Sequence, residues 1–185
     1  MSDFIILTDS SADLDADMVR KLDVQVLPLA FIMEEHTYYN YPDNRDMDPH
    51  IFYDRLRKGE LATTNAVNVA QYTEALEPLL QAGKDVLILA FSSGLSNTYN
   101  SSRLAVEEMS AKYPHRKLYT VDTLCASLGQ GLLVWYAARQ RDRGMSIEEV
   151  RDWIEEHKQN LCHQFTVDDL HFLKRGGRIS AATAM

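Results

Sequence analysis

The chain has 185 residues, of which 45% are hydrophobic and 25% are charged, proportions that are ordinary for a globular protein. Its formal charge of -8, with no long stripe of Lys and Arg, makes nucleic acid an unsuitable partner. The apolar runs are too short to span a bilayer or to form a secretion signal. We therefore expect a cytoplasmic protein without stable membrane insertion.

The cysteines and histidines do not form a metal-binding pattern. Cys125 and Cys162 lie far apart without C-x-x-C spacing, which predicts neither a disulfide framework nor a zinc site. We expect both to be small buried hydrophobes. His157 and His163 do not have the spacing that places two ligands on one helix face, so no metal site is predicted.

Short β-branched runs alternate with helical patterns, which is typical of an α/β fold with a mainly parallel sheet flanked by helices. Residues 4–7 predict the first strand, and Ser10 or Ser11 can cap the helix that follows. Residues 24–27 and 29–32 predict two further extended segments.

The next part of the chain is polar before it becomes helical. Residues 34–47 are rich in tyrosine and predict an exposed excursion. Asp48 followed by Pro49 predicts a helix start, with Asp as the cap and Pro at the first helical position. Asn68 with Gln71 three residues later is a capping-box pattern that opens another helix.

The middle of the chain contains its clearest strand. Residues 86–91 form an unbroken apolar run, which suits the centre of a parallel sheet. Residues 118–121 predict another strand, after which Thr123 can cap a long helix. Ser146 with Glu149 is a second capping-box pattern.

Three polar loops carry the residues best suited to binding, namely residues 8–11, 63–65 and 92–94. Loops that follow parallel strands gather at the carboxyl edge of the sheet, where ligands usually bind. Hydroxyl groups in front of helix N-termini suit an anion. The same residue types also cap helices, so each loop taken alone supports both interpretations.

Two other sequence features could support chemistry, namely Ser93 and the cationic turn at residues 174–178. A serine hydrolase using Ser93 is an alternative function, but the esterase motif needs Gly where Phe91 and Leu95 stand. Residues 174–178 form a cationic turn in which two glycines permit close approach and Arg178 offers a fork for carboxylate or phosphate. A solvated basic loop explains this turn equally simply. A ligand-free interaction module is the third function considered.

Four segments then resemble one known family in the right order. Residues 6–14 read ILTDSSADL and resemble the opening of the DegV family. Residues 91–99, FSSGLSNTY, are similar to its S-S-x-L-S-G-T-Y segment. Residues 122–131, DTLCASLGQG, resemble its D-S-x-x-A-S-x-G-x-G segment. Residues 168–180, DDLHFLKRGGRIS, resemble its D-D-L-x-Y-L-K-K-G-G-R-I-S signature.

The resemblance implies a lipid-binding function. DegV proteins bind a long-chain fatty acid, and in many bacteria they are the acyl-binding subunit of a fatty acid kinase whose ATP-binding subunit phosphorylates the exposed carboxylate. By position, Thr63 and Ser93 correspond to the family's carboxylate ligands, with Ser92 as a nearby alternative. Arg178 corresponds to the arginine at the pocket rim, where the kinase docks. The resemblance implies a carrier without catalysis of its own, a bound fatty acid as ligand, and no metal or other cofactor.

The chain departs from the family pattern at two motifs, and about a third of a typical family member is missing after Met185. The family's T-S-Q-P reads T-T-N-A at residues 63–66, and the glycine of L-S-G-T-Y is Asn97, which accepts positive φ well. The resemblance divides the chain into an α/β domain over residues 1–158, which carries the carboxylate-binding loops, and residues 159–185 as the start of a truncated second lobe. Each buried CH₂ contributes about 0.8 kcal/mol. We therefore expect this shortened chain to bind fatty acid poorly unless another chain replaces the missing lobe.

Overall fold

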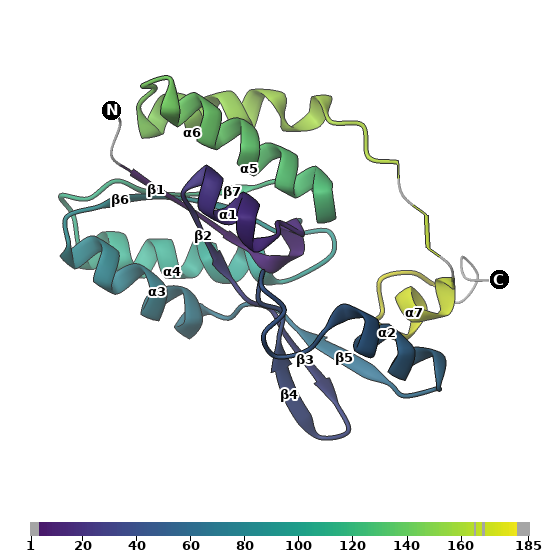
Figure 1. Cartoon of the computed structure of the whole chain (residues 1–185). Coiled ribbons are helices and arrows are strands. Elements are labelled where there is room, and N and C mark those ends of the chain that lie inside the picture. The colour runs from purple at the N-terminus through teal and green to yellow at the C-terminus, as the bar shows by residue number, and fades with distance from the viewer. Residues whose placement is uncertain (1–3, 165, 168, 181–185) are drawn as a thin grey trace.

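The computed structural model describes residues 4–164, 166–167 and 169–180, and it has the α/β fold that the sequence predicts (Figure 1). A parallel sheet has the strand order β2-β1-β6-β7, and a separate antiparallel sheet has the order β4-β3-β5. We call them the main sheet and the small sheet. The strands are β1 (Phe4–Asp9), β2 (Val24–Leu27), β3 (Ala30–Met33), β4 (His36–Tyr39), β5 (Ala62–Asn65), β6 (Asp85–Ala90) and β7 (Leu118–Asp122).

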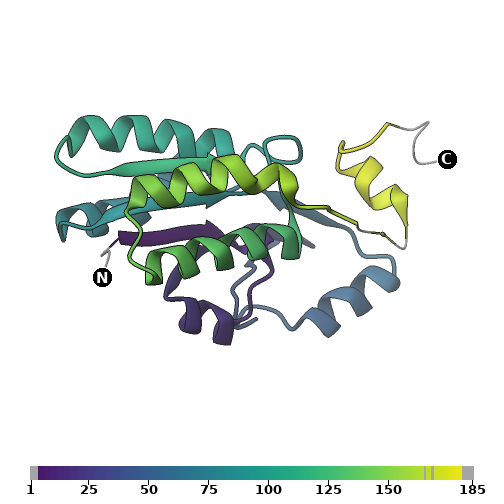
Figure 2. The ribbon, with the colours of Figure 1, turned by 90° about the horizontal axis from the view of Figure 1, so that it is seen from above.

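The main sheet is covered on both faces. Side chains alternate along a strand, so Leu87 and Leu89 of β6 join one buried cluster and Ile88 joins the other. Helices α1, α5 and α6 cover the first face, and α3 and α4 cover the second (Figures 1 and 2). The α-helices are α1 (Ala16–Leu22), α2 (Pro49–Arg57), α3 (Val69–Gln81), α4 (Thr98–Lys112), α5 (Ser127–Asp142), α6 (Ile147–His157) and α7 (Leu170–Arg175).

The local start signals in the sequence predict three helix N-termini correctly. Asp48 caps α2 by accepting a hydrogen bond from the His50 amide at 2.7 Å, with Pro49 at the start of the helix. Asn68 and Gln71 form the predicted capping box of α3, and Ser146 with Glu149 forms that of α6. These signals depend only on residues a few positions apart, and that is why the sequence reveals them.

Two predicted caps are wrong. Ser10 and Ser11 do not begin an α-helix, because the Asp9 carboxylate accepts from the Ser11 amide and bends the chain into a 3-10 turn, η1 (Ser10–Ala12). Asp15 caps α1 instead. Thr123 does not cap α5, because its hydroxyl donates to the Ala90 carbonyl at 2.7 Å and so joins β7 to β6.

The excursion predicted over residues 34–47 is partly regular. β4 pairs antiparallel with β3 inside it, so that Tyr38 lies opposite Phe31 and stacks on its ring at 5.3 Å. The ring of Phe52 in α2 also contacts the Phe31 ring edge-on, with 5.1 Å between the ring centres. The hairpin of β3 and β4 therefore has an aromatic face, formed by Phe31 and Tyr38, and Phe31 packs against α2.

A buried arginine of α5 connects that helix to the end of α1. Arg141 of α5 donates to the carbonyls of Leu22 at 2.7 Å and Asp23 at 2.8 Å, where α1 ends. The last carbonyls of a helix have no partner within it, so the guanidinium satisfies them. The contact holds α1 and the start of β2 against α5.

After α6 the chain continues through η2 (Lys158–Asn160) to α7, and both views place α7 beyond the carboxyl edge of the main sheet (Figures 1 and 2). The division at residue 158 stays a prediction, and residues 181–185 of the predicted second lobe lie outside the described residues. Cys125 is buried, but the expectation for Cys162 is wrong, because it is exposed in the irregular segment after η2. Within the described chain, no helix combines the length and the apolar character needed to span a bilayer.

Candidate functional site

The candidate site lies at the carboxyl edge of the main sheet. The neighbouring strands β1, β6 and β7 end there at Asp9, Ala90 and Asp122, and each continues into a loop. Two of the three polar loops predicted from the sequence, the one after β1 and the one after β6, therefore share this edge. The third contains Thr63 and Thr64 and belongs to β5 of the small sheet.

Asp9 is the buried polar centre of this edge. Its carboxylate accepts from the amide and the hydroxyl of Ser11, from the Phe91 amide at 2.8 Å and from the Gln130 side chain at 3.2 Å. Gln130 also donates to the Thr8 hydroxyl at 3.1 Å, and so it joins α5 to β1. Asp9 therefore fixes the loop after β1 and the start of the loop after β6 to one point.

The loop after β6, residues 91–97, carries Ser92 and Ser93, and we call it the serine loop. Ser92 is buried, and its hydroxyl accepts from the Gly94 amide at 3.2 Å. Ser93 is exposed, and its amide donates to the Asp122 carboxylate at 3.1 Å. An oxyanion hole requires free amides beside the nucleophile. The amides of Ser93 and Gly94 both have partners, so this loop does not provide one in the structure observed.

A polar hollow of about 380 Å³ lies beside this loop. One side is the loop that ends at Asn97, the residue before α4, where the positive end of the helix dipole favours an anion. The other side is the cationic turn after α7, so the structure brings Arg178 to the serine loop from more than eighty residues away in sequence. The hollow is lined by Ala66, Gly94, Leu95, Ser96, Asn97, Gly176, Gly177 and Arg178.

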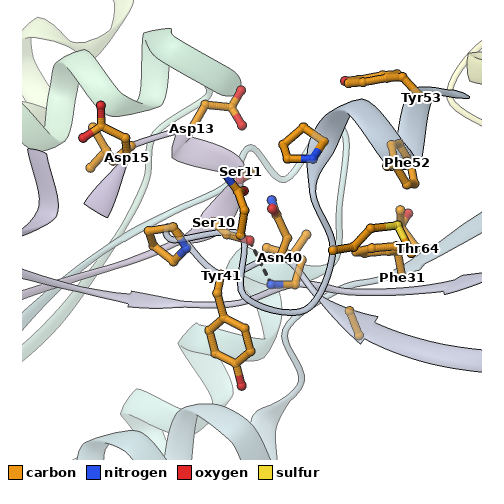
Figure 3. A pocket seen from close by; sticks show the side chains of 17 residues that line it. Ser10, Ser11, Asp13, Asp15, Phe31, Asn40, Tyr41, Phe52, Tyr53 and Thr64 are labelled. Carbon is orange, nitrogen blue, oxygen red and sulfur yellow. Dashed lines mark hydrogen bonds between the residues drawn. The ribbon is translucent and has the colours of Figure 1, made fainter. Parts of the chain in front are cut away.

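A second, mainly apolar hollow of about 450 Å³ lies between the two sheets (Figure 3). Its body consists of aliphatic and aromatic side chains from β3, α2 and the segment before α2. Its rim carries Asp13 and Asp15, and none of the described residues that line it is Lys or Arg. The lining residues are Ser10, Ser11, Asp13, Leu14, Asp15, Leu29, Ala30, Phe31, Asn40, Tyr41, Pro42, Asn44, Met47, Pro49, Phe52, Tyr53 and Thr64.

The two adjacent threonines of β5 point to opposite faces of the small sheet. Thr64 pairs with Phe31 and lines the apolar hollow with it (Figure 3). Thr63 pairs with Ile32, and successive side chains of a strand alternate between faces, so Thr63 lies on the other face. The structure therefore places Thr64 in the apolar hollow. Thr63, which was predicted to bind the carboxylate, is not among the residues that line either hollow.

Burial changes the titration of three groups near the site. Desolvation raises the pKa of Asp9, although its hydrogen bonds to Ser11, Phe91 and Gln130 act in the opposite direction. Burial also raises the pKa of the Cys125 thiol to about 11, which makes it a poor nucleophile. The pKa of the Tyr72 phenol is raised well above 10.0 by burial and by the nearby charge of Asp9.

The sequence analysis included Asp9 in a polar loop without giving it a role, and it did not assign Asp122 and Gln130 to the site. Each is joined to the site by a hydrogen bond to a residue far away in the chain, which local patterns do not show. Their position directly after predicted strands was the available signal for the two acids. Among residues 4–164, 166–167 and 169–180, no cluster of His, Cys, Asp or Glu is suited to hold a metal ion.

The arrangement defines a parallel α/β protein with a polar hollow and a mainly apolar hollow near the carboxyl edge of the main sheet. Residues 3–185 match the family described as uncharacterised protein, DegV family, and the chain belongs to this family. A DegV domain-containing protein, CPE0026, of Clostridium perfringens is 48% identical over 184 residues. That alignment covers 100% of this chain and 63% of the relative, so the chain spans less than two thirds of its relative's length.

Solved structures have the same fold. A DegV family protein from Thermus thermophilus, described by its fatty acid binding, superposes with a TM-score of 0.83 at 31% identity. The match covers 98% of this chain and 62% of that one. DegV from Bacillus subtilis, described as a fatty acid binding protein, gives a TM-score of 0.81 at 28% identity, covering 100% of this chain and 64% of that one.

Proposed function

We propose that this chain binds a long-chain fatty acid, with the acyl tail in the apolar hollow and the carboxylate at the polar hollow. One observation carries the proposal, namely that Thr64 lines the apolar hollow and Ala66, two residues later, lines the polar one. Two residues of extended chain span about 7 Å, so one amphiphile can reach both hollows. The fatty acid binding of the Thermus thermophilus and Bacillus subtilis relatives supports this ligand class.

The charges decide which way the ligand lies. Asp13 and Asp15 at the rim of the apolar hollow repel a carboxylate, whereas Arg178 and the start of α4 attract one at the polar hollow. The hydroxyls of Ser92 and Ser93 then donate to the carboxylate in charge-assisted hydrogen bonds. Thr63 is the third proposed ligand, from the resemblance to the family pattern.

The acyl tail contributes most of the binding free energy, and the hydroxyls determine at which end of the site the carboxylate lies. Each buried CH₂ contributes about 0.8 kcal/mol, so a long chain contributes more in total than one hydrogen bond to a carboxylate, which contributes about 1.5–3 kcal/mol. The first experiment is therefore mass spectrometry of organic extracts of the purified protein, followed by titration with palmitic acid. If extracts of a version extended to the length of the relatives hold no lipid and palmitic acid does not bind to it, the protein is better described as a ligand-free interaction module.

Alanine variants test the residues assigned to the carboxylate. Ser93→Ala combined with Thr63→Ala is expected to lower palmitic acid affinity roughly tenfold through the loss of charge-assisted bonds. Thr64→Ala is the matched comparison, because Thr64 is the adjacent threonine on the opposite face. If Thr64→Ala weakens binding and Thr63→Ala does not, Thr64 replaces Thr63 as the ligand. Unchanged binding by all variants removes the site assignment.

The chain presents the carboxylate to an ATP-dependent fatty acid kinase subunit, with Arg178 at the contact. Arg178 is exposed at the rim of the polar hollow, where a partner can reach both the guanidinium and the ligand head. Arg178→Ala should weaken capture of the kinase subunit while palmitic acid affinity is kept. Arg175→Ala, an exposed arginine of α7, is the control and should leave capture unchanged.

The chain has no catalysis of its own in this proposal. The engaged amides of Ser93 and Gly94 support that assignment. The alternative, a serine hydrolase using Ser93, predicts stoichiometric labelling of Ser93 by an activated-serine probe. Absence of labelling in wild-type protein that binds palmitic acid supports the carrier over the hydrolase.

A further inference from the structure

The backbone of the serine loop is held from both sides by carboxylates. The Phe91 amide donates to Asp9 Oδ2 at 2.8 Å, and the Ser93 amide donates to Asp122 Oδ1 at 3.1 Å. The amide between them, that of Ser92, donates to the Cys125 carbonyl at 3.1 Å. Three consecutive amides therefore point at fixed protein acceptors instead of at a ligand.

The strand order explains this geometry. Asp9 is the last residue of β1 and Asp122 is the last residue of β7, and these two strands flank β6. The loop leaves the end of β6, so one carboxylate reaches it from each neighbouring strand. We call Asp9 and Asp122 the carboxylate clamp.

Each member of the carboxylate clamp is itself held in place. Asp9 uses both oxygens, since Ser11 donates to Oδ1 and Gln130 donates to Oδ2 beside the Phe91 amide. Asp122 accepts from the Ser93 and Leu124 amides through the same oxygen, Oδ1, and both bonds are 3.1 Å long. Leu124 has φ 54, a left-handed conformation that is uncommon for leucine, and this bond helps to keep it.

Asp9 is the single acidic residue that is fully buried in the described part of the chain. Burying a charge is costly unless donors compensate for it. The structure supplies four hydrogen bonds to Asp9, and one of them is the amide that starts the serine loop. The cost of burying Asp9 is thus offset by bonds that also hold the serine loop in one conformation.

We propose that Asp9 and Asp122 are positioning residues for the fatty acid carboxylate, which rests on the function proposed above. By taking the amides of Phe91 and Ser93, the carboxylate clamp leaves the hydroxyls of Ser92 and Ser93 as the donors that the loop offers to a ligand. The site then recognises the head group through side chains held at fixed positions. The clamp residues themselves do not touch the ligand.

Two substitutions at Asp122 separate geometry from charge. Asp122→Asn keeps an oxygen that can accept from Ser93 and Leu124, whereas Asp122→Ala removes the acceptor altogether. Palmitic acid and hexadecanol share a chain length and differ in the head group. Asp122→Ala should lose palmitic acid affinity about tenfold and hexadecanol affinity less than about twofold, and Asp122→Asn should restore palmitic acid affinity to within about twofold of wild type.

Asp9→Asn adds an independent arm at the other end of the loop. An asparagine has a single acceptor oxygen, so it cannot accept at both positions that Asp9 now uses. This variant should lower the affinity for palmitic acid more than the affinity for hexadecanol, as is expected for Asp122→Ala. Asp85→Ala is the control, because Asp85 accepts from the Lys117 amide at 2.9 Å at the opposite end of the same sheet. Asp85→Ala should leave the affinities for palmitic acid and hexadecanol unchanged.

Hydrogen exchange of the ligand-free chain gives a readout that does not depend on binding. Amides 91–96 should exchange at least about tenfold faster in Asp122→Ala than in wild type, and they should be unaffected in Asp85→Ala. Equal weakening of both ligands, or unchanged exchange of the loop in Asp122→Ala, overturns the positioning role. If wild-type protein extended to the length of the relatives binds neither ligand, the proposed function fails, and the exchange result alone decides whether the clamp holds the loop.

Discussion

The main sheet and the small sheet differ in how deeply their residues are buried. Leu87, Ile88 and Leu89 of β6 are each 0% exposed, because helices cover both faces of the main sheet. In the small sheet only Met33 is fully buried, and the helix beside it, α2, has no buried residue. The apolar hollow lies where the two sheets meet. We call the main sheet with its covering helices the platform, and the small sheet with α2 the attachment. The platform is well packed, and the weakly packed attachment helps to form the proposed binding site.

The largest expected effect tests the platform directly. Ile88→Ala should lower the free energy of unfolding by about 2–5 kcal/mol, because it leaves a cavity in the centre of the core. Phe31→Ala in the small sheet should cost less, since Phe31 is only half-buried. Urea unfolding measures both. Equal losses would show that the small sheet is as integral to the fold as the main one.

A pair of glycines on α5 compares a contact inside the platform with a contact to the C-terminal segment. A Cβ at Gly131 would lie 2.6 Å from the backbone oxygen of Ala12, so Gly131→Ala should cost about 1–3 kcal/mol in urea unfolding. A Cβ at Gly129 would meet the His163 ring, which lies on an exposed segment that can move away. Gly129→Ala should therefore have little effect on stability.

The same substitution should release His163 from Cys125. The His163 Nε2 lies 2.9 Å from the Cys125 sulfur, and the ring covers the thiol. In a Cys162→Ser background, alkylation of Cys125 should be faster with Gly129→Ala than with Gly129 retained. An unchanged rate would mean that the ring does not control access to the thiol.

Helix caps give a smaller and sharper comparison. Asn68→Ala removes the cap of α3 on the platform and should lower the free energy of global unfolding by about 1 kcal/mol. Asp48→Ala removes an equivalent cap from α2, but α2 buries no residue and can open locally. Its loss should appear as faster hydrogen exchange in α2 with a smaller change in the urea midpoint. Equal midpoint shifts would argue against local opening.

The smallest effect is a surface one on the platform. Lys112 and Tyr113 donate to Glu77 at 2.5 and 2.8 Å, and these bonds lower the pKa of Glu77 below 4.5. A lowered pKa means that the contribution to stability is present above pH 4.5 and is lost as the pH falls through the value in the folded state. Glu77→Gln should therefore unfold at slightly lower urea than wild type near neutral pH. The two midpoints should converge in acid, and a constant gap would contradict this role.

The sequence predicted the platform better than the attachment, for a physical reason. The unbroken apolar run of β6 and the capping box of α3 are signals that lie within a few residues. The hairpin of β3 and β4 was predicted only in part, because its residues are polar on the exposed face and are kept in place by aromatic contacts such as that of Phe31 with Phe52.

The candidate site was harder to predict than the fold. The resemblance to DegV proteins indicated Ser92, Ser93 and Arg178, and the structure places Arg178 in the polar hollow beside residues 94–97. Ser92 and Ser93 precede these residues in the same loop but do not line the hollow. Their role in binding stays a prediction. Which of Thr63 and Thr64 faces the apolar hollow depends on the pairing of β5 with β3, which the sequence does not specify. The carboxylate clamp depends on the order of strands in space, so local patterns could not show it.

The contact of Arg141 with the carbonyls of Leu22 and Asp23 has a consequence for protein synthesis. A ribosome makes α1 long before it makes α5, so during translation no guanidinium is yet present to donate hydrogen bonds to the carbonyls at the end of α1. β1 likewise waits for β6, its neighbour in the sheet. The N-terminal segment therefore lacks these contacts, and its apolar surfaces stay uncovered, until β6 and then Arg141 have left the exit tunnel.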